Sequence, residues 1–235
     1  MPEEKSGYGD LVVIATPDDT IETVAGKLGE LDIDWSEKTV VHCSGSLSSD
    51  KLSAVSAAGA NTASMHPIQT FKKGDGADRF KGITVSLEGS ADAIDILKPI
   101  IDDMEANAIE VTPGQKQALH IGAVFASNYL VSLLHTVQTY LESEEIENGI
   151  DIMKPLIVQT LRNIFESGTA ESLTGPVSRG DVQTVETHLS RLIFHPDQQA
   201  LYRQLGKTAL QIASENDQLT PEAAEKLTEL FDFDS

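Results

Sequence analysis

Apolar residues in the first half of the chain fall into short runs separated by longer segments of helical periodicity. The short runs predict strands at residues 11–15, 39–43, 61–65, 83–87 and 108–111. The first is continuously apolar, as in strands buried on both faces, whereas residues 83–87 alternate apolar and polar positions, which predicts one solvated face. Helices are predicted at residues 21–28, 50–58 and 91–104, the last bent or broken at Pro99. Strands that alternate with helices predict a mostly parallel sheet covered by helices.

The pattern changes at Pro113, after which every periodic segment predicts a helix. Residues 116–141 are apolar nearly all round, which predicts a buried helix. Gly168 is expected to stop a second helix, and Asp181 and Thr220 are expected to cap two later ones. Helices after residue 141 are predicted at 150–166, 181–192, 197–214 and 221–230. The sequence therefore predicts an α/β domain over residues 1–112 and an all-α domain over residues 113–235.

Composition excludes several classes of protein. The 235 residues include 37 acidic and 17 basic side chains, which gives a net charge of −20 at pH 7. A protein needs a basic surface to bind nucleic acids or anionic membranes, so neither is expected as a partner. Cys43 is the single cysteine, so no intrachain disulfide forms, and a buried apolar filler describes it better than a reactive thiol.

Targeting signals are also not predicted. The first ten residues are polar, and the apolar stretch at 121–134 is interrupted by Ser127 and Asn128 and is too short to span a bilayer. We therefore expect a soluble, cytoplasmic protein.

Polar residues follow three of the predicted strands directly. In open parallel sheets, ligands bind outside the carboxyl ends of the strands. For Asp18 and Ser44 taken singly, helix caps and turns are the better explanation. For His66, which precedes a proline, the structural and functional explanations stay open. The candidate ligand contacts at these strand ends are Thr16, Pro17, Asp18, His42, Ser44, Gly45 and His66.

The long apolar helix carries a second polar group. At about 100° per residue, Lys116, Ser127, Asn128 and His135 fall on the same side as His120. One explanation is a structural hydrogen-bond network or a polar dimer contact, because buried polar groups need partners. The other is that His120 and Asn128 face a ligand, with the histidine as proton donor or acceptor.

A third candidate is Arg179, in a loop between Gly175 and Gly180. Its guanidinium offers a fork for a carboxylate or phosphate, and the glycines indicate a sharply bent backbone. Capping explains the neighbouring Asp181 fully but does not explain Arg179. We therefore favour a functional role for Arg179.

Several known site types are missing from the sequence. The six histidines never pair at a spacing of three or four, and no metal-binding motif occurs, so no metal is expected. The Gly-x-Gly-x-x-Gly fingerprint of dinucleotide-binding folds is absent, and Gly74-Asp75-Gly76 matches it at only two positions. Gly-x-Ser-x-Gly is also absent, which argues against a serine hydrolase.

Taken in order, the motifs resemble one family. They are residues 13–19, 42–45, 66–71, 120–130 and 173–181, followed by His188-Leu189. This series resembles predicted oxidoreductases that join a Rossmann-like NADP-binding domain to a C-terminal helical domain of unknown function. Distant relatives of that family are pyrroline-5-carboxylate reductase and prephenate dehydrogenase.

The resemblance implies an NADP-dependent oxidoreductase acting on a small carbonyl, imine or hydroxy compound. It places residues 16–19 and 42–45 at the nicotinamide end of the cofactor. It places His66, His120, Asn128 and Arg179 at the substrate, with His120 as the acid/base. It also implies a homodimer formed through the helical domain.

The chain departs from this family at its beginning. The family has a glycine fingerprint and two or three strands before the segment that matches residues 11–16, so we expect only a partial Rossmann-like domain here. The outer edge of the strand at 11–15 should then be open. We also expect this chain alone to bind NADPH weakly or not at all. The alternative function is a non-catalytic binding or dimerisation module that has lost the cofactor-binding half.

Overall fold

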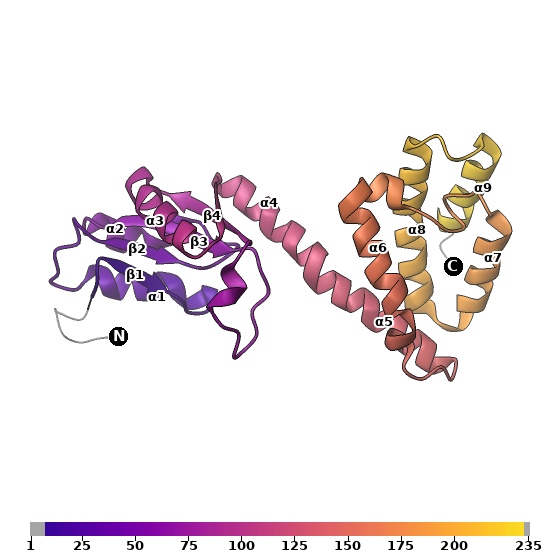
Figure 1. Ribbon diagram of the computed structural model, residues 1–235, viewed down its shortest axis with the longest axis horizontal. Coiled ribbons are helices and arrows are strands. Elements are labelled where there is room, and N and C mark those ends of the chain that lie inside the picture. Colours follow the sequence, from indigo (N-terminus) through magenta and orange to yellow (C-terminus); the bar gives the residue numbers. More distant parts are fainter. Residues whose placement is uncertain (1–7, 233–235) are drawn as a thin grey trace. The chain divides into compact units, whose positions relative to one another are not determined.

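The computed structural model describes residues 8–232, and the chain forms two compact units, residues 1–130 and 131–235 (Figure 1). We call them the sheet unit and the helical unit. The polar leader expected at residues 1–7 lies outside the described residues. The division falls within the helical stretch that follows the sheet. The predicted fold class, a partial Rossmann-like sheet followed by helices, is confirmed.

The sheet unit contains a five-stranded sheet in the order β1-β2-β3-β4-β5. All its neighbouring pairs are parallel except β3 with β4, and all five strands lie where short apolar runs predicted them. Within the described part of the chain, β1 pairs only with β2, so its outer edge is open, as expected. The strands are β1 (Leu11–Ile14), β2 (Thr39–His42), β3 (Asn61–Pro67), β4 (Thr84–Gly89) and β5 (Asn107–Glu110).

Helices cover both faces of this sheet. On one face, α1 (Asp18–Gly29) and α2 (Ser53–Ala57), which follows the 3-10 turn η2 (Ser49–Leu52), enclose a core around Trp35 and Leu52. On the other face lies α3 (Ala91–Asp103). Of the bend or break expected at Pro99, the break is wrong, because α3 continues through this proline to Asp103. A second 3-10 turn, η3 (Ala77–Phe80), lies in the loop before β4.

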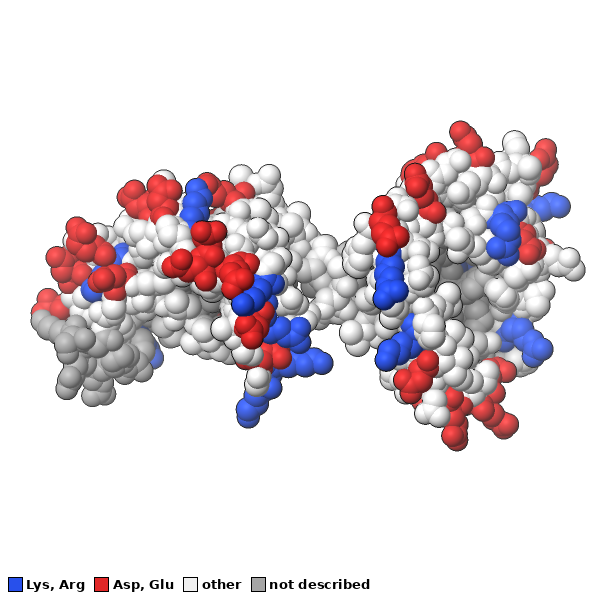
Figure 2. Space-filling model, in the orientation of Figure 1, with Lys and Arg blue, Asp and Glu red and all other residues white. Residues whose placement is uncertain are grey.

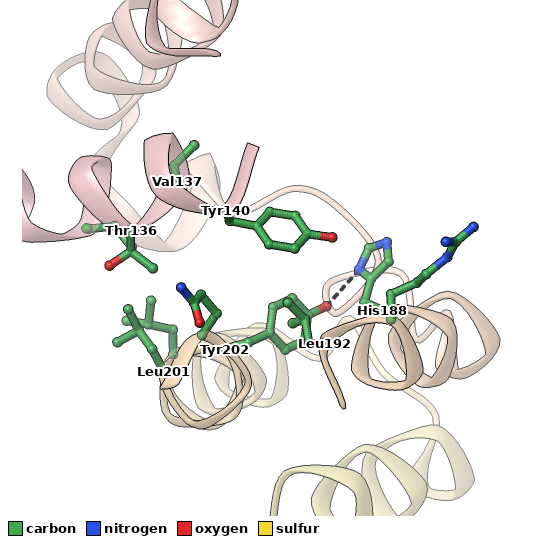
Figure 3. Close-up of a pocket in the computed structure, with 11 residues that line it drawn as sticks. Thr136, Val137, Tyr140, His188, Leu192, Leu201 and Tyr202 are labelled. Carbon is green, nitrogen blue, oxygen red and sulfur yellow. Dashed lines mark hydrogen bonds between the residues drawn. The ribbon is translucent and has the colours of Figure 1, made fainter. Parts of the chain in front are cut away.

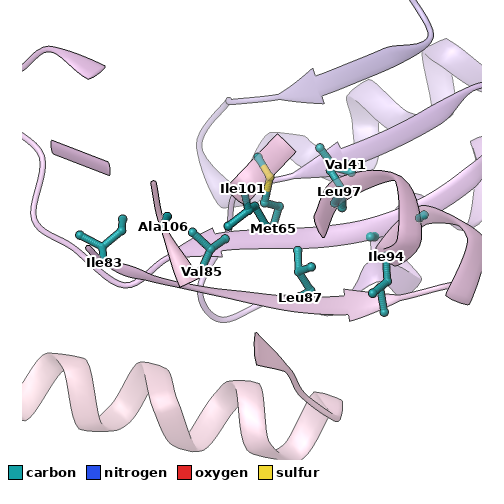
Figure 4. Packing of buried hydrophobic residues seen from close by; sticks show 11 residues of the cluster. Val41, Met65, Ile83, Val85, Leu87, Ile94, Leu97, Ile101 and Ala106 are labelled. Atoms are coloured by element: carbon teal, nitrogen blue, oxygen red, sulfur yellow. The ribbon is translucent and has the colours of Figure 1, made fainter. Parts of the chain in front are cut away.

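Side chains that alternate along β3 separate the core from the polar face. Met65 points toward α3, where it packs with Leu97 and Ile101 (Figure 4), and Ala63 belongs to the same buried cluster. The residues between them, such as Ser64, point to the opposite face, because successive side chains of a strand alternate. The α3 face is therefore apolar along β3, whereas the opposite face, which also carries the apolar core around Trp35 and Leu52, carries the polar side chains of this strand.

A continuous helical stretch follows the sheet: α4 (Pro113–Ala123), the π-helical turn η4 (Val124–Tyr129) and α5 (Leu130–Ser143). The prediction that this stretch is buried is wrong. Ile121 is 57% exposed and Phe125 is 64% exposed. Only the side of α4 that carries Lys116 packs against the rest of the sheet unit. An all-round apolar pattern shows that a helix needs cover, but it does not identify the molecule that supplies the cover.

The helical unit contains α5, α6 (Gly149–Ser172), α7 (Val182–Arg191), α8 (Pro196–Glu215) and α9 (Pro221–Asp232), with the short 3-10 turn η5 (Leu192–Phe194) before α8. Its core joins α7 to α9 through Val185, Leu189, Leu227 and Phe231. The predicted caps are confirmed. The Asp181 carboxylate accepts a hydrogen bond from Thr184 N, and Thr220 Oγ1 accepts one from Ala223 N. Gly168 leaves the helical conformation with φ +82°, as its predicted role as a stop requires.

Two surface features qualify the expectations from composition. The apolar stretch at residues 121–134, expected to be too short to span a bilayer, belongs to a 31-residue helix, Pro113–Ser143, that is long and apolar enough to cross a membrane by length and composition. Acidic side chains outnumber basic ones on the face shown in Figure 2, as the net charge of −20 requires.

Candidate functional site

The turn after β2 is the centre of a polar cluster in the sheet unit. Ser44 Oγ accepts hydrogen bonds from Ser46 N (3.2 Å) and Leu47 N (3.0 Å), and it donates to Asp18 Oδ2 (2.8 Å). Ser46 Oγ donates to the same carboxylate oxygen at 2.9 Å. The expectation that Asp18 caps its own helix is therefore wrong. Pro17 occupies the N-cap position without a side-chain cap, and Asp18 ties the start of α1 to the turn.

His42 supports this turn from inside the protein. Its ring is fully buried, Nδ1 accepts a hydrogen bond from Ser44 N at 3.2 Å, and Nε2 lies 3.1 Å from Ser48 O. Since Nδ1 is an acceptor, the proton of the neutral ring lies on Nε2 and is donated to Ser48 O. Burial lowers the pKa of His42, which keeps the ring neutral. His42 thus positions the turn, and both of its nitrogens are occupied.

Lys116 holds the same turn from α4. Its Nζ donates to Ser44 O at 2.5 Å, and Ser64 Oγ donates to that oxygen at 3.3 Å. Lys116 is only 2% exposed, and burial lowers its pKa to about 8, although Glu88 and Asp18 act in the opposite direction. The helical spacing in the sequence predicts that Lys116 lies beside His120, but it gives no reason to select Lys116 as a site residue. Its burial and its contact with Ser44 make it part of the site.

Gly45 lies between two histidine rings. A methyl group at Gly45 would lie 2.6 Å from His120 Nδ1 and 2.8 Å from His66 Nε2. The two rings meet edge to face with centroids 6.1 Å apart. Burial, together with the charges of Lys116 and His120, lowers the pKa of His66 to about 4. His66 is therefore neutral at pH 7. Only glycine fits at position 45, because both rings approach the backbone there.

Glu88 is a buried carboxylate that the sequence pattern did not reveal. It is 7% exposed and accepts hydrogen bonds from Ser49 N (2.7 Å) and Ser49 Oγ (2.8 Å). The solvated face predicted for this strand is wrong, because Ser86 is 1% exposed. Alternation identifies a polar face but does not tell whether water or other polar groups cover it. In the sheet register Glu88 lies opposite Ser64.

The strand-end cluster therefore brings together part of the predicted site, together with Lys116. Thr16 and Pro17 lie exposed beside Asp18, where α1 begins. The members of the strand-end cluster are Asp18, His42, Ser44, Gly45, His66, Lys116 and His120.

Two further predicted residues, Asn128 and Arg179, are described separately from this cluster. Asn128 lies exposed in η4, where a π-helical turn replaces the α-helix. A turn closed by i→i+5 bonds contains about one residue more than an α-turn, so a wheel of 100° per residue does not apply across it. Arg179 belongs to the helical unit, where its backbone N–H donates to Gly175 O at 3.3 Å.

The described residues fit one end of a dinucleotide cofactor and not the other. The Ser44–Gly45 turn and the neutral His66 present uncharged polar groups, which suit a nicotinamide ring. The first turn of α1 carries Asp18 and Asp19, which oppose the negative charge of a pyrophosphate. Within residues 8–232, no glycine-rich turn opens a helix directly after a strand, and no cluster of three metal-ligating side chains occurs.

Fold and cluster together define a class: an oxidoreductase-like protein in which a Rossmann-like sheet unit precedes a helical unit. Residues 83–209 match the model of the family described as Domain of unknown function (DUF2520). The match covers more than half of the chain, and the chain belongs to this family.

Solved structures share this architecture over most of their length. Protein TM1727 from Thermotoga maritima is 27% identical, with a TM-score of 0.75 over 90% of this chain and 81% of that one. Protein BF3122 from Bacteroides fragilis, described as a candidate NADP oxidoreductase, is 24% identical, with a TM-score of 0.71 over 91% of this chain and 80% of that one. A candidate oxidoreductase from Mycobacterium avium 104 is 12% identical, with a TM-score of 0.53 over 94% and 76%. The two matches below 25% identity show the fold alone.

No curated protein matches the chain. The structural matches nevertheless confirm the resemblance inferred from the motifs. Together with the burial of Lys116 against the sheet unit, they indicate a soluble protein rather than one whose Pro113–Ser143 helix crosses a membrane.

Proposed function

We propose that the protein is an NADP-dependent oxidoreductase that acts on a small carbonyl, imine or hydroxy compound. The observation that carries the proposal is the packing of two histidine rings against Gly45, beside the fixed Ser44 turn. Polar, hydrogen-bonded groups gather there at the carboxyl ends of parallel strands, where open α/β sheets bind their ligands. The cytoplasmic location predicted from the sequence is part of the same proposal.

When bound, the cofactor would supply or accept a hydride at the substrate carbon. The Ser44–Gly45 turn, with Thr16, Pro17 and Asp18 beside it, would contact the nicotinamide end. His42 would position this turn without touching the ligand, because it is fully buried. Lys116 would hold the carbonyl of Ser44 in place.

His120 is the proposed acid/base. It is less buried than Lys116, so a substrate can reach it. In the reducing direction its imidazolium donates a proton to the substrate oxygen or nitrogen, and in the oxidising direction the neutral ring takes the proton back. His66 remains neutral beside it and orients the substrate through a ring nitrogen. The roles of Asn128 and Arg179 in orienting the substrate rest on the sequence resemblance.

The test measures oxidation of NADPH by the full chain with a panel of small aldehydes, ketones and cyclic imines. Removing a general acid costs typically 10²–10⁴-fold, so His120→Gln should lower the rate by about 10²-fold or more. His135→Gln, which changes an exposed histidine outside the cluster, serves as the control and should leave the rate unchanged. Equal rates for the two variants would overturn the role of His120.

Cofactor affinity is measured separately by fluorescence titration. We expect weak binding of NADPH, because the described residues provide no glycine-rich phosphate turn and Asp18 and Asp19 oppose the phosphates. A micromolar Kd or better would contradict this expectation. No binding at millimolar NADPH, together with no turnover, would overturn the proposed enzyme.

A binding or dimerisation module is the second candidate function. The observation in its favour is the exposure of large apolar side chains on one side of α6, where Ile152 is 58% exposed and Leu156, one turn later, is 64% exposed. Exposed apolar patches of this kind mark interaction surfaces. We propose that the helical unit forms a homodimer through this helix. Leu156→Glu should then shift the mass measured by light scattering toward the monomer, whereas Gln211→Glu on α8 should not.

A further inference from the structure

The helical unit contains a cavity that plays no part in the proposed chemistry. It has a volume of about 380 Å³ and lies between α5 and the pair α7–α8 (Figure 3). This volume falls near the small end of the range of about 300–1,000 Å³ that is typical of sites for small molecules. Its apolar wall is formed by Leu133, Val137, Leu192, Leu201 and Leu205.

The cavity is partly open to solvent, because Leu205, which lines it, is 45% exposed and Arg191 is exposed as well. The α5 residues that line it, Leu133, Thr136, Val137 and Tyr140, are spaced as i, i+3, i+4 and i+7 and so occupy one face of the helix. Val131, outside this set, is 67% exposed. The α5 face that points into the cavity is therefore the face turned toward the unit's own α7 and α8.

Polar groups gather at one end of this apolar wall. His188 Nδ1 and Tyr202 Oη form a hydrogen bond of 2.9 Å, and Figure 3 shows the hydroxyl of Tyr140 pointing toward His188. Both tyrosine rings are held from behind. Tyr140 meets His195 edge to face at 5.3 Å, and Tyr202 packs against Phe231 at 6.5 Å. Burial raises the pKa of Tyr202, so its hydroxyl keeps its proton at neutral pH.

Arg191 adds a positive charge to the same cavity. It follows His188 by three residues on α7, so the two side chains lie on one side of that helix. Among residues 8–232, Arg191 forms no ion pair, although acidic residues greatly outnumber basic ones in this chain. A guanidinium that lines a cavity is suited to bind a carboxylate through two parallel hydrogen bonds.

We propose that this cavity binds a small amphipathic carboxylic acid, with an aryl or short alkyl body. The carboxylate meets Arg191 and the His188–Tyr202 pair, and the apolar body fills the space between the leucines. A neutral ligand would leave Arg191 without a counter-charge, and a larger anion such as a nucleotide would not bury its polar groups among leucines. The site is independent of the strand-end cluster, because every residue that lines it belongs to the helical unit.

The test is isothermal titration of the full chain with phenylacetate and hexanoate, and with phenylacetamide as the neutral isostere of the first. Both acids should bind and the amide should bind at least about tenfold more weakly, because hydrogen bonds to a charged group are stronger than those between neutral groups. Arg191→Gln should weaken phenylacetate by about tenfold or more. Arg162→Gln on α6, the matched loss of an exposed arginine outside the cavity, should leave its affinity unchanged.

Leu201→Trp fills the cavity and should abolish binding of both acids. If Leu201→Trp does not fold, Arg191→Gln still tests the proposal. Arg191 is exposed, so its replacement should leave the fold intact. Equal affinity for acid and amide, or equal affinity in Arg191→Gln and the parent, would overturn the proposal. Loss of a dimer in Leu201→Trp, seen by light scattering without any acid binding to the parent, would also overturn it and assign the cavity to a second copy. None of these measurements depends on NADPH or on turnover.

Discussion

The two units hold their polar groups in different ways. In the sheet unit, the groups at the strand ends already bind one another: Ser44 donates to Asp18, and Lys116 donates to Ser44 O. In the helical unit, the polar groups border an apolar space, and Arg191 lines a cavity rather than a hydrogen-bond network. The first arrangement fixes geometry before any ligand arrives, as chemistry on a bound substrate requires. The second leaves space and charge for the ligand to fill, as a binding pocket requires.

The difference extends to the cores beneath the two sites. A core of the sheet unit packs around Leu97 on the α3 face of the sheet, and the core of the helical unit packs around Leu227. Each site therefore rests on its own packed interior, and each can be weakened separately.

The largest expected effect comes from these two cores. Leu97 and Leu227 are both fully buried, so Leu97→Ala and Leu227→Ala should each lower the free energy of unfolding by about 2–5 kcal/mol. Hydrogen exchange followed by mass spectrometry should show lost protection in the sheet unit for Leu97→Ala and in the helical unit for Leu227→Ala. Equal loss of protection in both units for either variant would show a single cooperative structure and would break the comparison.

The next effect tests how tightly the strand-end cluster is packed. In Gly45→Ala the added methyl group meets His120 and His66 at 2.6–2.8 Å, so the free energy of unfolding should fall by about 1–3 kcal/mol. Gly122→Ala on α4 has no neighbour within 4 Å and should raise it by about 0.5–1 kcal/mol, because alanine is the better helix former. Urea denaturation of both variants measures the difference. An undiminished stability of Gly45→Ala would mean that the rings move aside freely and that the cluster is not rigid.

Much of the fold could be predicted because its signals are local. Short apolar runs bounded by polar turns predicted all five strands, and cap residues such as Asp181 predicted where helices begin. The antiparallel direction of β4 could not be predicted, because an alternating pattern is the same in both directions. The exposed α4 could not be predicted either, since a pattern specifies that a surface needs cover and not which molecule covers it.

The site was predictable residue by residue but not as a network. Ser44, His66 and His120 could be selected because they follow strand ends or interrupt an apolar helix. The bonds between them join residues that are far apart in the sequence, such as Lys116 and Ser44, so no local pattern contains them. The cavity of the helical unit left no signal at all, because leucines and tyrosines on a helix are ordinary core residues.

A pH effect should distinguish the polar cluster from the rest of the molecule. The pKa of His66 is about 4 in the folded protein and 6.5 for an ordinary histidine. Between these values the unfolded chain binds more protons, so the free energy of unfolding is fully retained above pH 6.5 and falls as the pH drops toward 4. The slope from one group is less than about 1.4 kcal/mol per pH unit, and water that reaches part of the ring reduces it further.

His66→Gln should remove this contribution, so its stability relative to the parent should rise as the pH falls from 6.5 to 4. Urea denaturation at several pH values measures it, and His135→Gln serves as the control histidine substitution. A constant difference between His66→Gln and the parent over this range would contradict the neutral, buried ring on which the proposed arrangement of the cluster depends.

The smallest effect concerns the hydrogen bonds that fix the turn itself. Ser44→Ala removes the donor to Asp18 and the acceptor for Ser46 N and Leu47 N, while the bonds that Ser44 O receives from Lys116 and Ser64 remain. A typical intramolecular hydrogen bond contributes about 0.5–1.5 kcal/mol, so the free energy of unfolding should fall by about 1 kcal/mol, with water compensating the exposed Asp18. Thr136→Val at the apolar cavity of the helical unit loses one hydroxyl that bonds only its own helix, and it should change stability by less than about 0.5 kcal/mol. If Ser44→Ala and Thr136→Val were equally stable, the hydrogen bonds of Ser44 would contribute nothing to the stability of the strand-end turn. The shape of the turn would then come from packing alone.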